Sequence, residues 1–384
     1  MQYDFIVIGA NGVQGKIVAK DLLLSGHSVL LAAIDDYNLD SLIDFKKSDF
    51  THLNLENITK VKRIIKKSGA SVVINCSIDD YNLAITKTCL ELGVNYVDLG
   101  SEEEMTYGQL NLDKDFKERG IIAITGLGST PGINNVMLKS IKDEFDSIET
   151  VKLGFAWSSN MEKFVVPFSI DAIACEFSEP AKVFENGKYV EKMPEDCRED
   201  FEYRGLKKQR TLFTKHIEHH TFKDFLADKG VKNIFVYSSF PEFSYRTIKT
   251  LIDLGLVSKQ KIDFQGAKIS PLDFTSEVLK RIPFPENYKE KEVIWLNVLG
   301  KKDSKDKVIK MEALAETLPG WEDATCNIDT GMPASIAGQM ILRGEIIEKG
   351  VFAPESVIPP EPFFKELGKR KIFIYKNGEI INQN

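Results

Sequence analysis

Three glycines near the start of the chain have a spacing that suits phosphate binding. Gly9, Gly12 and Gly15 stand three residues apart, between the apolar run FIVIG and a segment with apolar residues at helical spacing. Glycines here permit a sharp turn, close approach of a pyrophosphate to the backbone, and tight packing of helix on strand. The N-terminus of the helix would offer free N–H groups to the phosphates. We predict a dinucleotide site that uses Gly9, Asn11, Gly12, Val13 and Gln14; a turn without a ligand is the alternative.

An aspartate follows at the end of the second apolar run. Asp35 stands twenty residues after Gly15, and a carboxylate at this place can accept hydrogen bonds from the ribose hydroxyls of an adenosine. It would also repel a 2′-phosphate, and the next residues, 36–38, add no positive charge. The sequence therefore favours NAD over NADP as the cofactor. The alternative is that Asp35 only caps the next helix.

Two further loops are expected at the same edge of the sheet. In a doubly wound sheet, ligands lie outside the carboxyl ends of the strands. We expect Asp49 and Phe50, after the third strand, to flank the adenine. We expect Asn75, Cys76 and Ser77, after the fourth, to run beside the ribose and the nicotinamide. Cys76 is more readily explained as a small packing residue than as a nucleophile, because no histidine is near it in sequence.

The elements that would position these residues alternate regularly over residues 1–128. Apolar runs at 5–9, 28–34, 71–76, 94–100 and 121–128 predict buried strands, and helical patterns fall between them, at 12–26, 57–70, 79–93 and 108–120. Such alternation predicts an α/β fold, a Rossmann doubly wound parallel sheet.

The pattern changes near residue 149 and indicates a second α+β substrate domain. Longer strand candidates follow at 150–157, 232–239 and 292–302, and an amphipathic helix is expected at 333–347. We assign 1–148 and 325–352 to the NAD(P)-binding Rossmann domain and 149–324 to the substrate domain, with 353–384 as a tail packing on the body. The long strands could pair across an interface, which suggests a homodimer.

Bulk properties restrict the partners. The net charge of -7 argues against nucleic acid and anionic membranes. No apolar run approaches about 18 residues, the length of a transmembrane helix. We expect a cytoplasmic protein whose partner is a small molecule. The five cysteines include no C-x-x-C pair, which fits a reducing compartment. No metal is expected, because the cluster of His216, His219 and His220 lacks a cysteine or aspartate at ligand spacing.

Several motifs resemble one known family. VINCSIDDYNLAITKTCLELGVNYVDLGSE (73–102), TGLGSTPGINNVML (125–138) and FENGK (184–188) are similar to the saccharopine dehydrogenase-like oxidoreductases. That family includes saccharopine reductase, lysine 6-dehydrogenase and carboxynorspermidine dehydrogenase. The resemblance implies a nicotinamide cofactor at a domain junction. It also implies an NAD(P)-dependent dehydrogenase acting on CH–NH donors, with hydride transfer at a carbon–nitrogen bond of an amino acid or polyamine-type amine.

The resemblance also implies two substrate-facing segments. One is the loop of Asp98, Leu99 and Gly100, continued by Ser101 and Glu102, for which an N-cap (Ser101 or Asp98) is the alternative. The other is the turn of Thr130, Pro131 and Gly132, with Asn135 on the following helix; a purely structural turn is the alternative. Saccharopine reductases tend to carry aspartate where this chain has Thr130. That departure argues against saccharopine itself and favours a rival, a non-catalytic NAD-binding sensor or scaffold.

The expected proton donors lie in the second domain. His216 and Glu218 alternate, so on a strand they would share a face, and such a pair could pass the proton that accompanies hydride transfer. Two alternatives stay open: His216 lies in a surface loop without a catalytic role, or the acid is another residue, namely Lys215, Tyr237 or Tyr245. We assign His219 and His220 to solvent or packing.

Overall fold

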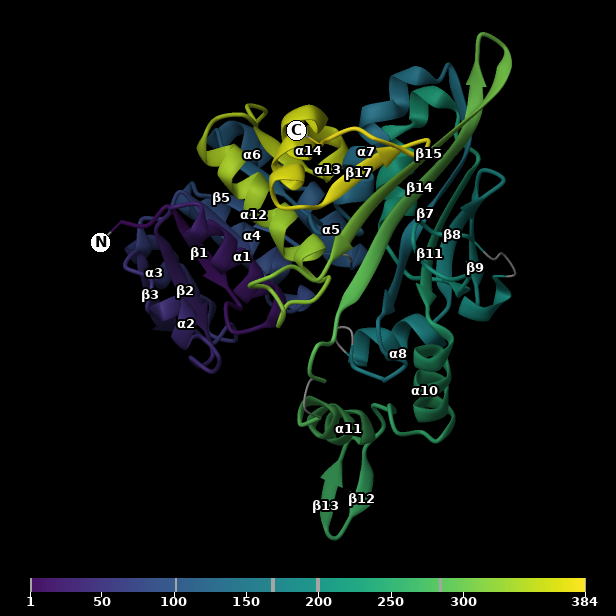
Figure 1. Ribbon diagram of the computed structural model, residues 1–384. Coiled ribbons are helices and arrows are strands. Elements are labelled where there is room, and N and C mark those ends of the chain that lie inside the picture. Colours follow the sequence, from purple (N-terminus) through teal and green to yellow (C-terminus); the bar gives the residue numbers. More distant parts are fainter. Residues whose placement is uncertain (1, 101, 167–169, 198–200, 283–284, 384) are drawn as a thin grey trace.

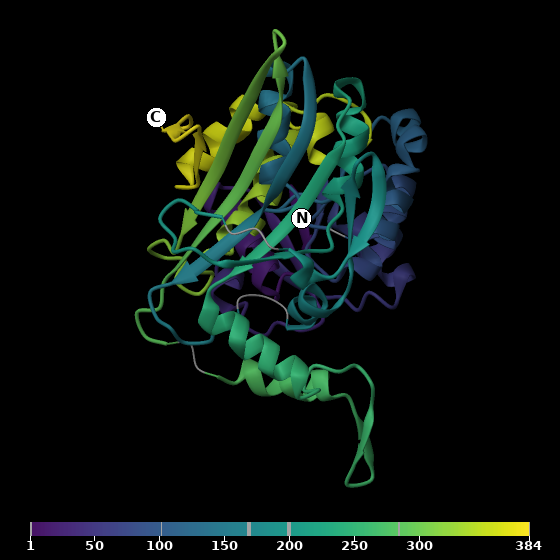
Figure 2. The same ribbon diagram turned by 90° about the vertical axis from the view of Figure 1, so that its right-hand side faces the viewer.

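The computed structural model describes residues 2–100, 102–166, 170–197, 201–282 and 285–383. Figure 1 shows two sheets, with the N-terminal purple and blue elements on one side and the long green strands on the other. The view in Figure 2, turned by 90°, shows the broad face of the second sheet and a hairpin that projects below it.

The first sheet has seven strands in the order β16-β6-β5-β4-β1-β2-β3. All of its recorded pairings are parallel, and the order 3-2-1-4-5-6 is that of dinucleotide-binding sheets. The predicted Rossmann fold is confirmed. The strands are β1 (Phe5–Ile8), β2 (Val29–Ala33), β3 (Ser48–His52), β4 (Val72–Asn75), β5 (Asn95–Asp98), β6 (Ile122–Ile124) and β16 (Gly350–Phe352).

Helices connect these strands and cover both faces of the sheet. They are α1 (Val13–Leu24), α2 (Asp40–Ile43), α3 (Ile58–Ser68), α4 (Asn82–Leu92), α5 (Glu103–Leu110) and α6 (Asp113–Arg119). Local sequence fixes their ends: in α3 the Asn57 side chain accepts a hydrogen bond from the Lys60 N–H, and Gly69 ends the helix in a left-handed conformation. These are the expected N-cap and C-cap chemistries.

The second sheet has nine strands, eight of them in the order β18-β17-β15-β14-β7-β11-β8-β9, with β10 paired to β11. It is mixed, because β7 and β11 are parallel whereas β7 and β14 are antiparallel. Its strands are β7 (Ser147–Ser159), β8 (Ala181–Glu185), β9 (Lys188–Lys192), β10 (Arg210–Phe213), β11 (Asn233–Phe240), β14 (Glu290–Lys302), β15 (Lys305–Glu316), β17 (Phe373–Lys376) and β18 (Glu379–Ile380).

The helices of this half are α7 (Ile133–Ile141), α8 (Ile170–Ser178), α9 (Glu218–Phe225), α10 (Glu242–Asp253) and α11 (Pro271–Lys280). The projecting hairpin is β12 (Ile262–Phe264) with β13 (Ala267–Ile269). The longest strands, β7 and β14, pair with neighbours on both edges. The reason given for a homodimer, strands free to pair across an interface, is therefore wrong for these two.

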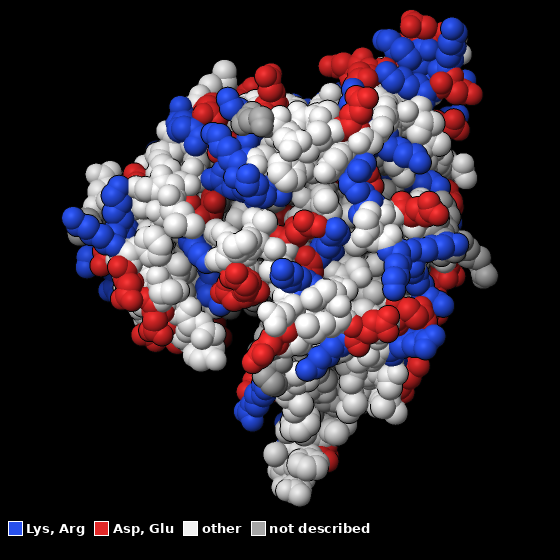
Figure 3. Space-filling view, in the orientation of Figure 1, with Lys and Arg blue, Asp and Glu red and all other residues white. Residues whose placement is uncertain are grey.

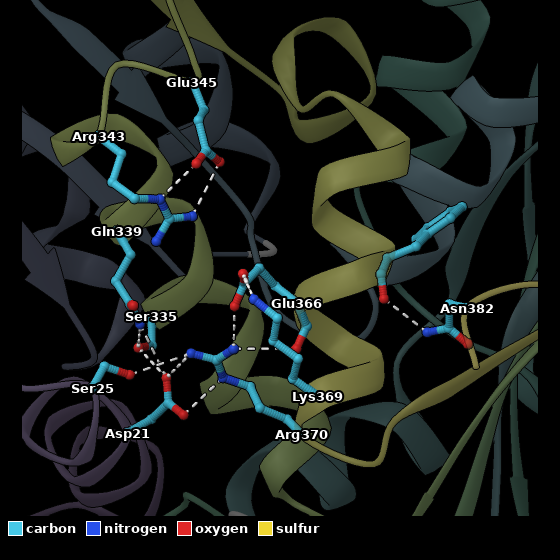
Figure 4. A network of polar contacts seen from close by, with 11 residues as sticks. Asp21, Ser25, Ser335, Gln339, Arg343, Glu345, Glu366, Lys369, Arg370 and Asn382 are labelled. Carbon is cyan, nitrogen blue, oxygen red and sulfur yellow. Dashed lines mark hydrogen bonds and ion pairs between the residues drawn. The ribbon is translucent and has the colours of Figure 1, made fainter. Parts of the chain in front are cut away.

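The C-terminal part of the chain returns to the first domain. Helix α12 (Ile328–Leu342) packs against α1, β4 and β5. It is buried on nearly every side, so the expectation of an amphipathic helix was wrong. Helices α13 (Pro354–Val357) and α14 (Pro360–Lys369) follow. Arg370, just after α14, pairs with Asp21 of α1, and Ser335 and Gln339 of α12 donate to the same carboxylate (Figure 4).

Within the described ranges, no helix combines the length and the apolar character needed to cross a bilayer. On the face shown in Figure 3, acidic and basic side chains are interspersed, so that face carries no extended basic surface.

Candidate active site

The glycine turn has the geometry of a phosphate cradle. Gly9 follows β1 with φ +75°, and a Cβ on it would lie 2.9 Å from the carbonyl carbon and oxygen of Cys76 and from the nitrogen of Ser77. No larger residue fits there, because the backbone after β4 passes directly alongside. Gly12 is the N-cap of α1, and the first turn of α1 holds no acidic side chain. The turn thus presents the free N–H groups of a helix N-terminus to an anion.

Asp35 lies just beyond β2, beside this turn. Its Oδ1 accepts hydrogen bonds from Asn11 Nδ2 at 2.8 Å and from the backbone N–H of Tyr37 at 3.1 Å. It does not cap α2, whose N-cap is Leu39, so the capping alternative is wrong. The carboxylate is exposed and held in place, which suits an acceptor for ribose hydroxyls.

Val13 and Gln14, the other two residues expected at the glycine turn, have different surroundings. Val13 is half exposed, at 51%. Gln14 donates from Nε2 to Asn327 Oδ1 at 3.3 Å, just before α12, and its Oε1 is buried without a hydrogen-bond partner among the described residues. Gln14 thereby connects the nucleotide turn to the start of α12.

Asp49 and Phe50 do not lie where the sequence suggested. Both are inside β3 and not in a loop after it. Asp49 pairs with Leu30 near the start of β2 and accepts a hydrogen bond from Tyr3, which precedes β1. Asp49 therefore lies at the amino end of the sheet, away from the glycine turn, and the expectation that these residues flank the adenine was wrong. Strand β3 includes the segment that was expected to follow it.

Asn75, Cys76 and Ser77 do follow or end β4 at the carboxyl edge. Asn75 is buried; its Oδ1 accepts from the Ser77 hydroxyl at 2.7 Å, and its Nδ2 donates to Asn82 at 2.7 Å. Burial raises the pKa of the Cys76 thiol, which disfavours the nucleophilic thiolate. Cys76 contributes backbone to the wall of the site.

Hydrogen bonds to the buried side chain of Asp98 stabilise the loop after β5. Asp98 is fully buried and accepts hydrogen bonds from Gln109 Nε2 at 2.6 Å and from the backbone N–H of Gly126 at 2.8 Å. Burial raises its pKa, although these donors oppose the shift. A Cβ on Gly100 would lie 2.8 Å from the same carboxylate, and Leu99 packs against the core. With its oxygens committed, Asp98 fastens the β5 and β6 loops together and does not face a substrate.

The N-cap of α5 is neither of the residues expected. The side chain of Glu102 accepts from the Met105 N–H at 2.9 Å. Ser101 lies outside the described residues.

The second turn connects β6 to α7. Gly132 has φ +137°, and a Cβ there would overlap the Gly128 carbonyl. Asn135 is buried; its Oδ1 accepts from the Gly132 N–H at 2.8 Å, and its Nδ2 donates to Glu355 at 2.8 Å. Asn135 thus supports the turn from behind and does not extend into the site, contrary to expectation.

Ser129 and Thr130 connect this turn to helices α7 and α12. Thr130 precedes Pro131 through a cis peptide and accepts from Asn134 Nδ2 at 3.1 Å. Ser129 Oγ lies 3.0 Å from Thr330 Oγ1 in α12. The start of α12 therefore contacts both turns, the first through Asn327 and the second through Thr330.

His216 and Glu218 are brought together, but not on a strand. β10 ends at Phe213 and α9 begins at Glu218, so the expectation of a shared strand face was wrong. His216 Nδ1 lies 3.3 Å from Glu218 Oε2, and their side chains are 10% and 0% exposed. Burial lowers the His216 pKa, but the carboxylates of Glu218 and Glu176 outweigh it and raise the pKa overall.

The alternative acids lie elsewhere. Lys215 is exposed, 3.6 Å from Glu179. Tyr245 donates to Glu195 at 2.6 Å, and Tyr237 is buried in an aromatic cluster with Phe213 and Trp295.

A group of acidic residues that the sequence reading missed lies at the junction. We call Glu176 of α8, Glu290 and Glu292 of β14, and Asp329 of α12 the acidic cluster. Cys326 joins its parts, with Sγ 3.2 Å from a Glu290 oxygen and 3.3 Å from a Glu292 oxygen. Oε2 of Glu176 and Oδ2 of Asp329 have no hydrogen-bond partner among the described residues.

The surroundings of these carboxyl groups disfavour their charged forms. Burial raises the pKa of Glu176 to about 7. Burial, with repulsion from the neighbouring carboxylates, also raises the pKa values of Glu292 and Asp329. Across the described ranges, no lysine or arginine pairs with any of the four carboxylates. Like charges gathered without a counter-ion are costly, and such groups concentrate where a ligand completes the site.

Only one short sequence pattern could have indicated the acidic cluster. Glu290 and Glu292 alternate at the start of a strand and therefore share one face. Glu176 and Asp329 carry no local signal, because only the tertiary structure brings them near Glu292.

The fold and this junction together define a nucleotide-binding Rossmann protein with a second domain that completes the site. Residues 5–124 match the saccharopine dehydrogenase NADP binding domain, and residues 128–372 match the saccharopine dehydrogenase C-terminal domain. The chain belongs to the saccharopine dehydrogenase family of NAD(P)-binding oxidoreductases, as its motifs suggested.

The chain is also similar to individual proteins, in sequence or in fold. The chain is 24% identical over 387 residues to carboxyaminopropylagmatine dehydrogenase of Synechocystis, covering 95% of each chain. It is similar in fold to saccharopine dehydrogenase (L-Glu forming) of Saccharomyces cerevisiae, with TM-score 0.76, 14% identity, and 99% and 100% of the two chains covered. It is also similar to the homospermidine synthase of Legionella pneumophila in complex with NAD, with TM-score 0.70, 14% identity, and coverage of 98% and 91%.

Proposed function

We propose that this protein is an NAD-dependent oxidoreductase that transfers hydride at the carbon–nitrogen bond of a polyamine-type substrate. The observation that carries the proposal is the acidic cluster, whose carboxylates have no lysine or arginine partner among the described residues and of which Glu176 alone interacts with a histidine, His216. A substrate with two or more ammonium groups supplies the missing charge. A monocarboxylic amino acid would leave most of it uncompensated. The named relative from Synechocystis acts, by its name, on an amine of this kind.

The cofactor would lie along the carboxyl edge of the first sheet. The Gly9–Gly12 turn would receive the pyrophosphate, Asp35 the adenosine ribose, and the segment 75–77 the nicotinamide half. When bound, the nicotinamide supplies the hydride chemistry. Because Asp35 is a fixed carboxylate beside Asn11, the proposal includes a preference for NAD over NADP.

The reaction balances as a reductive amination. A primary amine and a carbonyl compound lose water to form an imine; the imine then takes one hydride from the reduced nicotinamide at carbon and one proton at nitrogen. We assign the proton to the His216–Glu218 pair, on the ground that it is buried and lies beside Glu176 of the acidic cluster. The turn 128–132, braced by Asn135 and Glu355, would hold the substrate's reacting end against the nicotinamide.

The test follows reduced nicotinamide by its absorbance at about 340 nm. Purified protein receives NADH with a diamine, with a carboxylated aldehyde, or with both. The proposal expects oxidation of NADH only when both are present. Glu292→Gln should raise the KM for the diamine about tenfold, because one carboxylate no longer pairs with an ammonium group.

The rival, a non-catalytic sensor, gives a different pattern. It would bind NAD in calorimetry yet show no turnover with any diamine and aldehyde pair. That result would overturn the catalytic proposal while leaving the nucleotide site standing.

A further inference from the structure

Three side chains outside the proposed active site converge at the boundary of the two domains. Glu103 begins α5 of the first domain, and His219 and His220 lie in the first turn of α9. One potential ligand atom from each residue lies within 4.8 Å of those of the other two. The histidines are 1% and 6% exposed. Two imidazoles and a carboxylate are donors that suit a divalent transition metal, zinc above all.

His219 is the anomaly in this group. Both of its ring nitrogens are buried and have no side-chain hydrogen-bond partner among the described residues; the polar group beside them is the backbone of His216. A neutral imidazole keeps a lone pair on one ring nitrogen, which is the atom that a metal ion binds. Buried polar atoms in native proteins are nearly always satisfied, and an exception calls for a missing ion or water. Packing alone would be served better by an apolar side chain.

His220 is already oriented for ligation. One nitrogen, Nε2, lies 2.9 Å from Glu103 Oε1, and the other, Nδ1, lies 2.8 Å from the Tyr189 hydroxyl of β9. A histidine that binds metal through one nitrogen commonly has its other nitrogen held by a polar neighbour, which fixes the tautomer. Tyr189 occupies that position.

A cation already neutralises Glu103. Lys182 of β8 places Nζ 2.7 Å and 2.9 Å from the two Glu103 oxygens. Its side chain is 35% exposed, so the ammonium group can move into solvent. Any metal bound to Glu103 must therefore compete with Lys182.

We propose that Glu103, His219 and His220 form a binding site for a divalent transition metal of the zinc class, which ties α5 of the first domain to α9 of the second. Ligand atoms on a tetrahedral zinc ion lie about 3.4 Å apart, a spacing that falls within the 4.8 Å limit on the distances between the ligand atoms of these three residues. A water molecule completes the coordination. None of the three ligands is a residue assigned to hydride or proton transfer, although His219 and His220 directly follow Glu218. The role of the site is to hold the two domains together.

The experiment titrates Zn²⁺ into the chelator-treated full chain by calorimetry. It also records the visible spectrum with Co²⁺, whose bands report tetrahedral nitrogen and oxygen ligation. The wild type should bind one equivalent. His219→Leu should weaken binding by about 10- to 100-fold or abolish it. His52→Ala, which removes an exposed histidine elsewhere, should match the wild type.

Lys182→Met gives the more discriminating test, because this variant is predicted to bind Zn²⁺ more tightly than the wild type. Removing the competing ammonium group should tighten Zn²⁺ binding about tenfold, and the variant changes a half-buried surface side chain that the fold tolerates. Zinc should also raise the thermal midpoint of the wild type and of Lys182→Met, but not that of His219→Leu. Equal zinc affinity in the wild type and His219→Leu, or no gain in Lys182→Met, would overturn the proposal and assign the His219 nitrogens to a buried water.

Discussion

The pairing of Arg370 with Asp21 fastens the C-terminal helices to the nucleotide-binding domain, and its removal has a calculable cost (Figure 4). Arg370 donates from Nε and Nη2 to the two Asp21 oxygens at 2.8 Å and 3.0 Å, and the two side chains are only 11% and 8% exposed. Arg370→Met leaves a buried carboxylate without its cation, which costs roughly 3–5 kcal/mol. Ser335 and Gln339 still donate to Asp21, so we place the loss near the lower end, at about 3 kcal/mol.

The same region contains a matched control. Arg343 and Glu345 also form a two-bond pair (Figure 4), but their side chains are 37% and 36% exposed. Arg343→Met should therefore cost about 0–1 kcal/mol. Urea unfolding followed by tryptophan fluorescence measures both variants, with the midpoint compared at constant slope. Adding Asp21→Asn to Arg370→Met should restore part of the stability, because it removes the uncompensated charge. Equal losses in the two arginine variants would refute the reasoning.

Three further outcomes are expected. Asp35→Arg should weaken NAD binding and tighten NADP binding, each about tenfold; an unchanged ratio of dissociation constants in calorimetry would contradict the role of Asp35. The KM for the amine should fall about tenfold as the pH rises from about 6 to about 9. Burial raises the pKa of Glu176 to about 7 and also raises the pKa of Glu292. These carboxyl groups are therefore neutral at the acidic end of the range and charged at the basic end, where they attract the ammonium groups of the substrate. A flat profile of KM against pH would exclude an electrostatic role for the cluster. His216→Asn should lower kcat about 100-fold with nucleotide affinity unchanged, whereas the neighbouring exposed Lys215→Met should keep kcat; equal effects would remove His216 from the reaction.

The doubly wound parallel fold of the first sheet could be predicted from sequence because its signals are local. Most strands of this sheet are short apolar runs, and α3, α4 and α6 each end at a glycine in a left-handed conformation. The right-handed connections leave few other topologies. The errors occurred where tertiary packing overrides the local pattern. Asp49 is polar yet lies inside β3, and α12 looks amphipathic in sequence yet is enclosed by α1 and the sheet.

The candidate site also contains residues that local sequence patterns predict and residues that only tertiary packing brings together. The glycine turn and Asp35 follow from spacing along the chain. The acidic cluster contains residues of α8, β14 and α12 that are spread over more than 150 residues of sequence, from Glu176 to Asp329. No local sequence pattern predicts that these residues lie close together. Asp98 and Asn135 have the residue types of a substrate site, but burial commits their polar atoms to the loops that frame it.

Isotope transfer gives the most direct measurement. NADH carrying deuterium at C4 of the nicotinamide is incubated with the protein, a diamine and a carboxylated aldehyde, and the product is examined by mass spectrometry and proton NMR. We expect one deuterium on the carbon bonded to nitrogen in a new secondary amine. Deuterium on an alcohol carbon would show carbonyl reduction, and a product without deuterium would show no hydride transfer; either result would contradict chemistry at a carbon–nitrogen bond.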